Sequence, residues 1–296
     1  MARGLPPRRA GRRAARVCVR IESGGCSDVG RIRTNNEDSF RIVAPLNLFV
    51  LSDGMGGEAH GEVASALAVD TVAEHCLEAE NSPSAPVSAG TQTGLALKTR
   101  LLASAVRLAN RTIHESAERH PEQRGMGATL TAAWVEGPRL SLAHVGDSRA
   151  YLLRAGGLTQ LTSDHSFVAE QVRRGILTPQ QAETSEMQSV LLRALGAQPD
   201  VDVDADEHAV LERDVLLLCS DGLTRMVTEP EIASTLVLER DPQKAAEQLV
   251  ELANEHGGED NVTVVVIRLE PEPGGWFSRL LRWGRPANGS RDAGGD

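Results

Sequence analysis

The stretch Leu48-Phe49-Val50-Leu51-Ser52-Asp53-Gly54 is an apolar run that ends in a carboxylate and a glycine. A short continuous apolar run bounded by a turn signal predicts a strand buried on both faces, with Asp53 at its mouth. The stretch Val215-Leu216-Leu217-Leu218-Cys219-Ser220-Asp221-Gly222 repeats this design. One Asp-Gly pair after a strand is more often only a turn. Two such strands predict a packed sheet that carries carboxylates on a rigid scaffold.

Outward from these strands, helical and strand patterns are mixed. Helical periodicity runs from Gly61 to Glu78 and from Leu95 to Ala117, which predicts two long helices that cover a sheet. Their expected apolar stripes are Val63, Leu67, Val72 and Cys76 in the first helix, and Leu101, Leu102, Ala105, Leu108 and Ala109 in the second. Short strands separated by turns follow at 129–136, 140–145 and 150–154, which indicates sequential antiparallel pairing.

Residues 163–196 interrupt this rhythm with polar short helices and are interpreted as an inserted flap, in which Thr178 and Pro179 start one helix. Further helix starts at Thr228 and Asp241 precede a buried strand at 262–267. We expect one domain at 21–270, after a basic tail at 1–20 and before a Pro/Gly-rich tail at 271–296. Asn81 to Thr93 is expected to be an exposed loop.

Composition restricts the classes of function. The chain has 296 residues, a net charge of −10 and only 3% aromatic residues, which disfavours a nucleic-acid surface built by base stacking. Residues 1–20 carry seven arginines and no acid, so the remainder is strongly acidic. The four cysteines lack CxxC spacing, and no apolar run is long enough to cross a bilayer. We therefore expect a cytoplasmic protein with no nucleic-acid partner.

Four acidic clusters predict a metal site. They are Glu37-Asp38, Asp53-Gly54, Asp221-Gly222 and Asp260-Asn261, each placed at or near the end of a predicted strand. Mg²⁺ and Mn²⁺ prefer carboxylate, carbonyl and water oxygens, so carboxylates from separate turns can hold two ions that retain water. Such binuclear sites usually hydrolyse phosphate esters. Each cluster alone has a simpler interpretation as a solvated edge or a turn cap.

Seven short motifs resemble, in order, those of the protein phosphatase 2C family, and most closely its bacterial members. They cover about residues 21–269 and stand here as Arg33 to Asp38, Asp53 to Gly57, Gly127 to Thr129, Val145 to Arg149, Leu161 to Ser166, Ser220 to Leu223 and Asp260 to Thr263. The resemblance implies an α+β fold, a four-layer α-β-β-α sandwich of two antiparallel sheets flanked by helices, with the metals in a cleft at one end.

The resemblance also implies metal ligands. Asp53 is expected to bridge two Mn²⁺ or Mg²⁺ ions, Asp221 and Asp260 to complete one ion, and the Gly54 carbonyl to join the other. Glu37 and Asp38 then ligate directly or hold metal-bound waters. Asp147, with Asp221, corresponds to a site for a third and weaker ion, although Asp147 also suits its hairpin turn.

Arg33 and Asp38 are the expected catalytic residues, and Arg33 resembles the phosphate-binding arginine of the family. Its planar guanidinium can bind two phosphate oxygens, whereas the simpler interpretation is a surface salt bridge. A metal-activated water is expected to attack phosphorus in one step without a phosphoenzyme. Cys219 lacks a Cys-x5-Arg loop and is interpreted as a buried thiol rather than a nucleophile.

Two positions depart from the family pattern. Met55 follows Asp53-Gly54 where some members carry a histidine, so the proton donor to the leaving group stays open between a metal-bound water and His60. Ala128 removes a hydroxyl from a turn and leaves the metal ligands intact.

The predicted function is a metal-dependent phosphatase for phosphoserine and phosphothreonine in proteins, which opposes a bacterial kinase and shares that kinase's substrates. Two alternatives are a noncatalytic phosphatase-like binding module and a regulatory phosphatase for one dedicated stress-response protein. The complete set of carboxylates favours catalysis. The cationic amphipathic segment Trp276 to Trp283 suits either a weak membrane or partner contact or a flexible end that folds back on the domain.

Overall fold

The computed structural model describes residues 19–56, 60–82 and 94–271, which form two antiparallel sheets. The first sheet has the order β1-β11-β10-β7-β8, with β1 Val19–Asp28, β7 Arg149–Arg154, β8 Gly157–Gln160, β10 Val215–Cys219 and β11 Val262–Pro271. The second has the order β2-β3-β5-β6-β9, with β2 Asp38–Val43, β3 Leu48–Met55, β5 Leu130–Glu136, β6 Arg139–Val145 and β9 Asp204–Ala209. A short strand, β4 Gly127–Ala128, pairs with the end of β3.

The alternation of side chains along β11 explains why the sheets stack. Val262, Val264 and Val266 belong to a core shared with helices on the outer face. Val265 and Ile267, between and beyond them, belong to the core shared with the second sheet. Because successive strand residues point to opposite faces, the apolar run Val264 to Ile267 buries side chains on both sides of β11.

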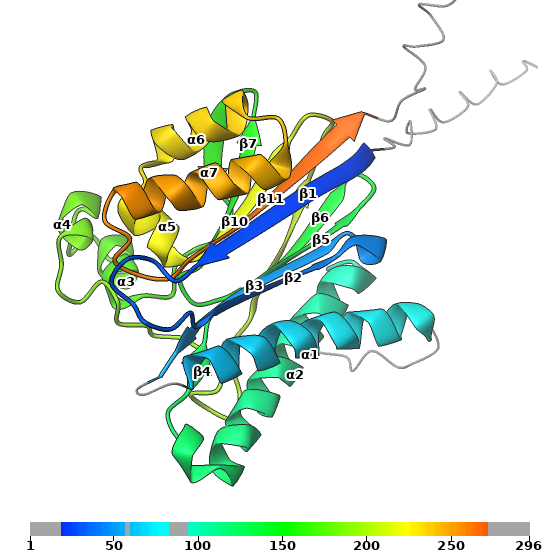
Figure 1. Cartoon of the computed structure of the whole chain (residues 1–296). Helices are drawn as coiled ribbons and strands as arrows, with labels where there is room; N and C mark the ends of the chain where they lie inside the picture. Colours follow the sequence, from blue (N-terminus) through cyan, green and yellow to red (C-terminus); the bar gives the residue numbers. More distant parts are fainter. Residues whose placement is uncertain (1–18, 57–59, 83–93, 272–296) are drawn as a thin grey trace, which may run out of the picture.

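Helices cover both outer faces (Figure 1). The long pair α1 Gly61–Asn81 and α2 Leu97–Arg119 packs on the second sheet. The first sheet is covered by α5 Asp221–Met226, α6 Glu229–Leu238 and α7 Pro242–Glu255. The predicted four-layer α-β-β-α sandwich is confirmed.

The remaining elements are short. Two 3₁₀ turns, η1 Ala44–Leu46 and η2 Pro121–Gln123, connect elements of the second sheet and its helices. Within the predicted flap lie α3 Phe167–Arg173 and α4 Pro179–Glu183, and Thr178 forms the expected capping box with Gln181. In Figure 1 these two helices lie at the end of the sandwich opposite the start of β1 and the end of β11.

The predicted apolar stripe of the first helix is only partly correct. Val72 and Cys76 are buried, but Val63 and Leu67 are partly exposed, and the centre of the buried face is formed by Ala64, Ala68 and Ala73. In α2, Leu108 is likewise only partly buried, whereas its neighbour Ala109 is fully buried. Small side chains let each helix approach the sheet and the other helix closely, so alanine rather than leucine marks the contact.

Two elements differ from the sequence prediction. Asp221 opens α5 instead of lying in a turn, with Ser220 at the N-cap position. Strand β9 was missed because its sequence, Asp204 to Ala209, is polar, and it gains its strand conformation by pairing with β6 at a sheet edge.

The predicted tails lie mostly outside the described residues, as does most of the predicted loop from Asn81 to Thr93, whose first residue, Asn81, ends α1 instead. Within the described part of the chain, no helix combines the length and the apolar character needed to cross a membrane.

Candidate metal centre

Asp38 and Asp53 lie on adjacent strands of the second sheet as direct cross-strand partners. Asp38 opens β2 and is 9% exposed, while Asp53 lies near the end of β3. The backbone of Asp53 is fixed on its other side, because its N–H donates to Thr129 Oγ1 at 2.9 Å and its carbonyl accepts from Thr129 N at 2.8 Å. The strand pairing therefore places two carboxylates side by side at one end of the sandwich.

Asp221 and Asp260 come from the other sheet, at the same end. Asp221 follows β10, Asp260 precedes β11, and these two strands are neighbours. Ser220 joins the sheets: its hydroxyl donates to Asp38 Oδ2 at 2.8 Å and accepts from Thr263 N at 2.9 Å. The aspartates of the two sheets therefore come together where the sheets touch, through the hydrogen bonds of Ser220.

Asn261 holds the loop that carries the catalytic candidates. Its side-chain oxygen accepts from Glu37 N at 2.8 Å, and its amide donates to the carbonyls of Val29 and Asn35, both at 2.9 Å. Asn261 is 6% exposed. The sequence marked it only as part of an Asp-Asn turn, and its role in fixing residues 29–37 depends on contacts more than 200 positions away in the chain.

Glycines bring the backbone of the site together. A methyl group on Gly54 would lie 2.1 Å from the Gly61 carbonyl oxygen, and one on Gly61 would lie 2.5 Å from Glu37 Oε2. Glu37 therefore lies against Gly61, the first residue of α1, and the backbone of Gly54 lies against the same residue. A Cβ at either position has no room, which explains the glycine beside Asp53.

Asp147 lies in the turn between β6 and β7 and is 8% exposed. The adjacent Ser148 hydroxyl hydrogen-bonds Thr129 Oγ1 at 2.7 Å, which connects this turn to the backbone of Asp53. Gly146 has a φ of +110°, and a side chain there would collide with Thr129. Through these contacts, the motifs Gly127 to Thr129 and Gly146 to Ser148 together fix the backbone of Asp53.

Two arginines face the aspartates. Arg33 Nη2 lies 2.9 Å from Asp260 Oδ2, and Arg225 Nη2 lies 2.5 Å from Asp221 Oδ2. Arg225 also places Nη1 3.9 Å from Asp260 Oδ2. Sequence reasoning identified Arg33 and missed Arg225; the available signal was a basic residue four positions after Asp221, which is the spacing of neighbours on one helix face.

The carboxylates disfavour one another's charge. Burial raises the pKa of Asp53 well above its usual range, and the charges of Asp38, Asp221, Asp147 and Asp260 add to the rise. Burial also raises the pKa of Asp38 to about 7, against hydrogen bonds from Thr263 and Ser220 that lower it.

The same holds at the rim of the cluster. Burial and the charge of Asp221 raise the pKa of Asp147 to about 7. Burial raises the pKa of Asp221, although the charge of Arg225 opposes the rise, and burial and Glu62 raise the pKa of Glu37. Such a cluster attracts cations.

The cluster fits hydrated divalent ions better than a closed cage. In the described part of the chain, no three His, Cys, Asp or Glu side chains surround one point as ready ligands. Mg²⁺ commonly retains several waters and takes only one or two carboxylates. Asp38 Oδ1 is also buried without a hydrogen-bond partner, which leaves an acceptor for an ion or its water. The donor set therefore suits Mg²⁺ or Mn²⁺.

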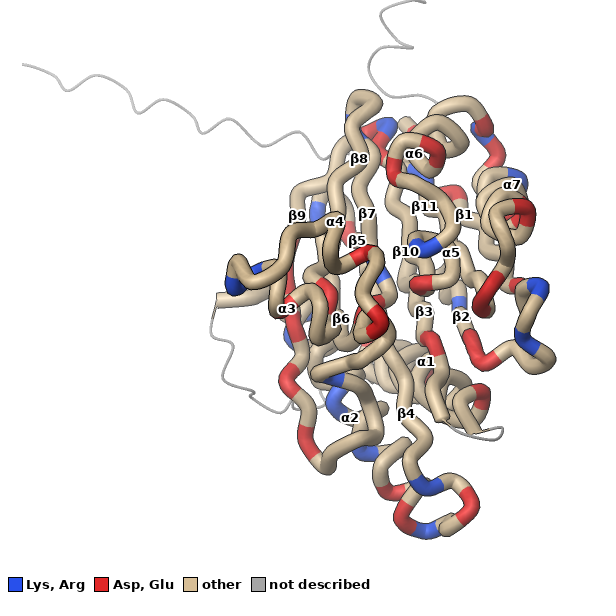
Figure 2. Tube along the Cα trace, turned by 90° about the vertical axis from the view of Figure 1, so that its left-hand side faces the viewer, with Lys and Arg blue, Asp and Glu red and all other residues tan. Residues whose placement is uncertain are grey.

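A cleft of about 1220 Å³ opens beside this cluster. Its lining includes Asp147, Asp221, Asp260, Arg33 and Arg225. The flap and the chain from the end of α5 to the start of α6 add apolar residues, which are Val168, Val172, Pro179, Ala182, Met226, Val227 and Pro230. Figure 2 shows acidic positions gathered where β2, β3, β10 and α5 come together. The lining is therefore partly charged and partly apolar.

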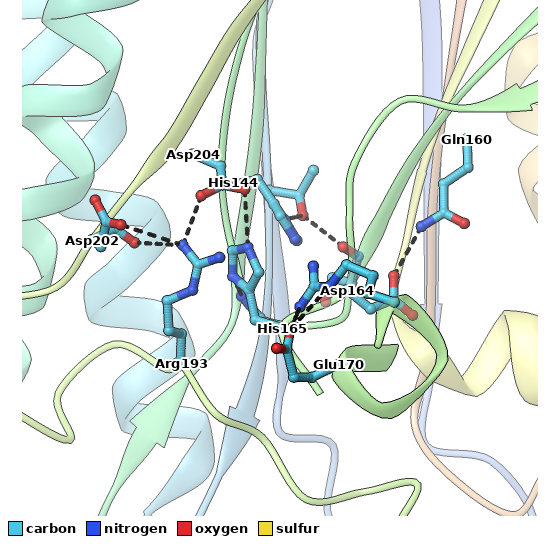
Figure 3. Close-up of polar contacts among 12 residues, drawn as sticks. His144, Gln160, Asp164, His165, Glu170, Arg193, Asp202 and Asp204 are labelled. Carbon is cyan, nitrogen blue, oxygen red and sulfur yellow. Dashed lines mark hydrogen bonds and ion pairs between the residues drawn. The ribbon is translucent and has the colours of Figure 1, made fainter. Parts of the chain in front are cut away.

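Asp204 holds both ends of the flap (Figure 3). Its Oδ2 lies 3.1 Å from His165 Nε2, near the beginning of the flap, and its Oδ1 accepts from Arg193 Nη1 at 2.6 Å, near the end. The ring of His165 also packs against His144, with centroids 4.8 Å apart. One carboxylate on β9 therefore ties the two stems of the flap to the second sheet.

Three further residues singled out in the sequence, Cys219, Ala128 and His60, lie outside the carboxylate cluster. Cys219 is fully buried, and burial raises its pKa to about 12, so it is no thiolate nucleophile. Ala128 pairs with Gly54 and with Leu195, where it serves the backbone of the site and leaves the carboxylates unaffected. His60 directly precedes α1 and is not among the residues that line the cleft.

Comparison with known proteins gives concordant matches. The profile of the protein phosphatase 2C family matches residues 31–255. Serine/threonine protein phosphatase PstP of Mycobacterium tuberculosis is 40% identical over 252 residues, which are 85% of this chain and 46% of that protein. Serine/threonine phosphatase stp of Listeria welshimeri is 37% identical over 244 residues, 81% of this chain and 93% of that protein.

A solved structure agrees with these matches. The catalytic domain of PstP in complex with two manganese ions superimposes with a TM-score of 0.70 at 39% identity, covering 85% of this chain and 99% of that one. The chain spans about half the length of the PstP proteins it matches.

Proposed function

Because this chain belongs to the protein phosphatase 2C family, we propose that it is a metal-dependent protein serine/threonine phosphatase. The observation that carries the proposal is the meeting of five aspartates, Asp38, Asp53, Asp147, Asp221 and Asp260, beside a cleft whose lining includes three of them, Asp147, Asp221 and Asp260, together with Arg33. They come from both sheets, and their mutual repulsion leaves a demand for positive charge.

Two Mn²⁺ or Mg²⁺ ions are the proposed cofactors, and when bound they supply an activated water and neutralise phosphate charge. Asp53 would be central to the set, with Asp221 and Asp260 on one side and Glu37, Asp38 and the Gly54 carbonyl on the other. Two manganese ions in the PstP catalytic domain support this assignment. Asp147, beside Asp221, is the proposed ligand of a third ion.

Arg33 is the proposed phosphate-binding residue. Its side chain is about half exposed and lines the cleft, so its guanidinium is free to leave Asp260 for an incoming phosphate. A bidentate guanidinium contact both orients the phosphoryl group and offsets charge that develops on its oxygens.

Asp38 is the proposed proton acceptor. Its Oδ1 is buried without a partner, whereas its Oδ2 accepts from Ser220. A carboxylate fixed by one oxygen presents the other in a defined direction, so Oδ1 is placed to accept a proton from the attacking water.

Phosphorylated proteins are the proposed substrates, because the relatives are named as serine/threonine phosphatases. The cleft volume of about 1220 Å³ also exceeds the roughly 300–1,000 Å³ of small-molecule pockets. The cognate kinase and its substrates are the proposed partners. The free thiols of Cys26, Cys76 and Cys219 support a reducing, cytoplasmic location. The catalytic domain is proposed to span 21–270, with the flap at 163–196.

The deciding experiment is hydrolysis of a phosphothreonine peptide by the whole chain, with Mn²⁺, with chelator, and with the Asp221→Ala variant. Turnover that requires Mn²⁺ and disappears in the other two samples supports the proposal. Absence of turnover in a folded, Mn²⁺-loaded sample contradicts it and leaves a phosphatase-like binding module.

A further inference from the structure

We propose that Arg225 is a second phosphoryl-binding residue, which acts with Arg33 as a two-arginine clamp on the substrate phosphate. This inference rests on the proposed phosphatase function. Arg225 lies on α5, the helix that begins with Asp221, so the proposed phosphate site has ligands from two different elements.

The geometry brings both guanidinium groups within ion-pair distance of one carboxylate oxygen. Arg33 Nη2 lies 2.9 Å and Arg225 Nη1 lies 3.9 Å from the same oxygen, Asp260 Oδ2. Arg33 comes from the loop before β2, and Arg225 from the helix after β10, so they approach this carboxylate from different elements. Two cations that share one anionic oxygen define a position that another anion of similar charge can occupy.

The other arginines that line the cleft are committed elsewhere. Arg149 donates to both oxygens of Asp164 and to the Tyr151 hydroxyl, and Arg173 pairs with Glu170 on its own helix. Those partners are not among the proposed metal ligands. Arg33 and Arg225 differ because their partners, Asp260 and Asp221, are the carboxylates that a bound cation would engage.

The charge balance favours a second arginine. The five aspartates and Glu37 carry six negative charges when ionised, and two divalent cations neutralise four of them, so a phosphate that carries close to two negative charges still meets a negative environment. Arg33 alone leaves one negative charge uncompensated, and Arg225 brings the site to about neutrality. The charge of Arg225 already reaches Asp147 and Asp221, whose pKa values it lowers against the effect of burial.

Arg225 is also held firmly enough to act. Its side chain is 27% exposed, against 52% for Arg33. The first turn of α5 is fixed against β11, because the Gly222 backbone passes so close to Asn261 that a Cβ would lie 2.1 Å from its carbonyl oxygen. A guanidinium that loses little freedom on binding can hold a phosphate bidentately, which an ammonium cannot do.

The test measures phosphate binding directly. Inorganic phosphate is titrated calorimetrically into the Mn²⁺-loaded whole chain and into Arg225→Gln and Arg225→Lys, and Mn²⁺ affinity is measured on the same proteins. Arg119→Gln is the matched control, since Arg119 also follows its acidic partner by four helical positions but lies on α2, away from the cleft.

We expect Arg225→Gln to raise the Kd for phosphate about 10- to 100-fold, because a charge-assisted hydrogen-bonded pair is lost. The same variant should raise KM for a phosphothreonine peptide. Arg225→Lys restores only part of the affinity, and Arg119→Gln matches the wild type. An unchanged phosphate Kd in folded Arg225→Gln overturns the clamp. Tighter Mn²⁺ binding with unchanged phosphate binding overturns it too, because Arg225 then only competes for the carboxylates.

Failure of the proposed function gives a different result. A wild-type chain that binds Mn²⁺ and phosphate but hydrolyses no phosphopeptide contradicts the phosphatase proposal, while the phosphate titrations still decide the role of Arg225. If Arg225→Gln does not fold, Arg225→Lys keeps the charge beside Asp221, and its phosphate Kd decides: a value equal to the wild type excludes bidentate binding.

Discussion

Asp38 and Asp53 face each other directly across the β2–β3 ladder, with a pKa raised by burial in both. Like charges at directly opposed strand positions destabilise a sheet. A bound cation would relieve this repulsion, because it offsets the charge of both carboxylates. The pair therefore links the stability of the fold to metal binding.

Asp53→Asn should stabilise the metal-free protein at neutral pH, since it removes the most crowded carboxylate of the cluster. We expect a gain on the order of 1–3 kcal/mol in the free energy of unfolding, together with loss of Mn²⁺ binding. Urea unfolding with chelator at pH 7.5 measures the gain. Asp206→Asn, at an exposed position on β9, is the control, and its free energy of unfolding should stay close to that of the wild type. If Asp53→Asn lowers the free energy of unfolding instead, repulsion among the carboxylates does not destabilise the metal-free fold.

The same cluster sets a pH dependence in the metal-free chain. The pKa of Asp38 is about 7 in the folded chain against an ordinary value of 3.8, so the unfolded chain releases this proton at a lower pH. Stability is therefore fully present below pH 4 and falls as the pH rises toward 7. Mn²⁺ should reverse this trend near pH 7. The difference in the free energy of unfolding between the wild type and Asp38→Asn, measured in chelator, separates this slope from that of other titrating groups. A difference that stays constant between pH 4.5 and 7.5 would contradict the prediction.

His144 should produce the opposite slope. Burial lowers its pKa to about 4 from 6.5, with a further contribution from the charge of His165. A depressed histidine pKa gives stability that is present above pH 6.5 and lost as the pH falls toward 4. His144→Gln should flatten that loss when its free energy of unfolding is compared with the wild type at each pH. His120→Gln, at an exposed position, should parallel the wild type throughout.

Gly222→Ala should destabilise the protein although alanine usually favours a helix by about 1 kcal/mol. The added methyl group meets the Asn261 carbonyl oxygen at 2.1 Å, so α5 must move away from β11, at a cost of roughly 1–3 kcal/mol, and Asp221 moves with it. Thermal unfolding and Mn²⁺ titration measure both effects. Gly157→Ala, whose nearest neighbour is Arg154 O at 3.6 Å, should leave both unchanged.

Asp204→Asn should loosen the flap, because one carboxylate holds His165 and Arg193 at its two stems. We expect faster amide hydrogen exchange in 166–192 and a higher KM for phosphopeptides, with Mn²⁺ affinity retained because Asp204 is absent from the carboxylate cluster around Asp53. Asp202→Asn is the control, since that side chain is 90% exposed and reaches Arg193 only at 4.0 Å. If residues 166–192 exchange at the same rate in Asp204→Asn and Asp202→Asn, Asp204 does not hold the flap in place.

Much of the fold follows from local sequence. Apolar runs in β3, β10 and β11 predict buried strands because a strand between two packed layers needs apolar side chains on both faces. Helix starts at Thr178, Thr228 and Asp241 were correct because capping depends on a few adjacent residues. By contrast, the polar strand β9 was missed, because its pairing partner β6, more than 50 residues earlier, decides its conformation.

The sequence by itself determined which residue types belong to the site: Asp53 and Asp221 were placed after buried strands, and Arg33 to Asp38 and Asp260 were recognised by their motifs. Only the tertiary structure decided how they meet. The β2–β3 register opposes Asp38 to Asp53, stacking of the sheets brings Ser220 to Asp38, and the first turn of α5 turns Arg225 toward Asp221 and Asp260. Local patterns specify the conformation of a segment, whereas the distance between charges on different segments depends on how whole sheets pack.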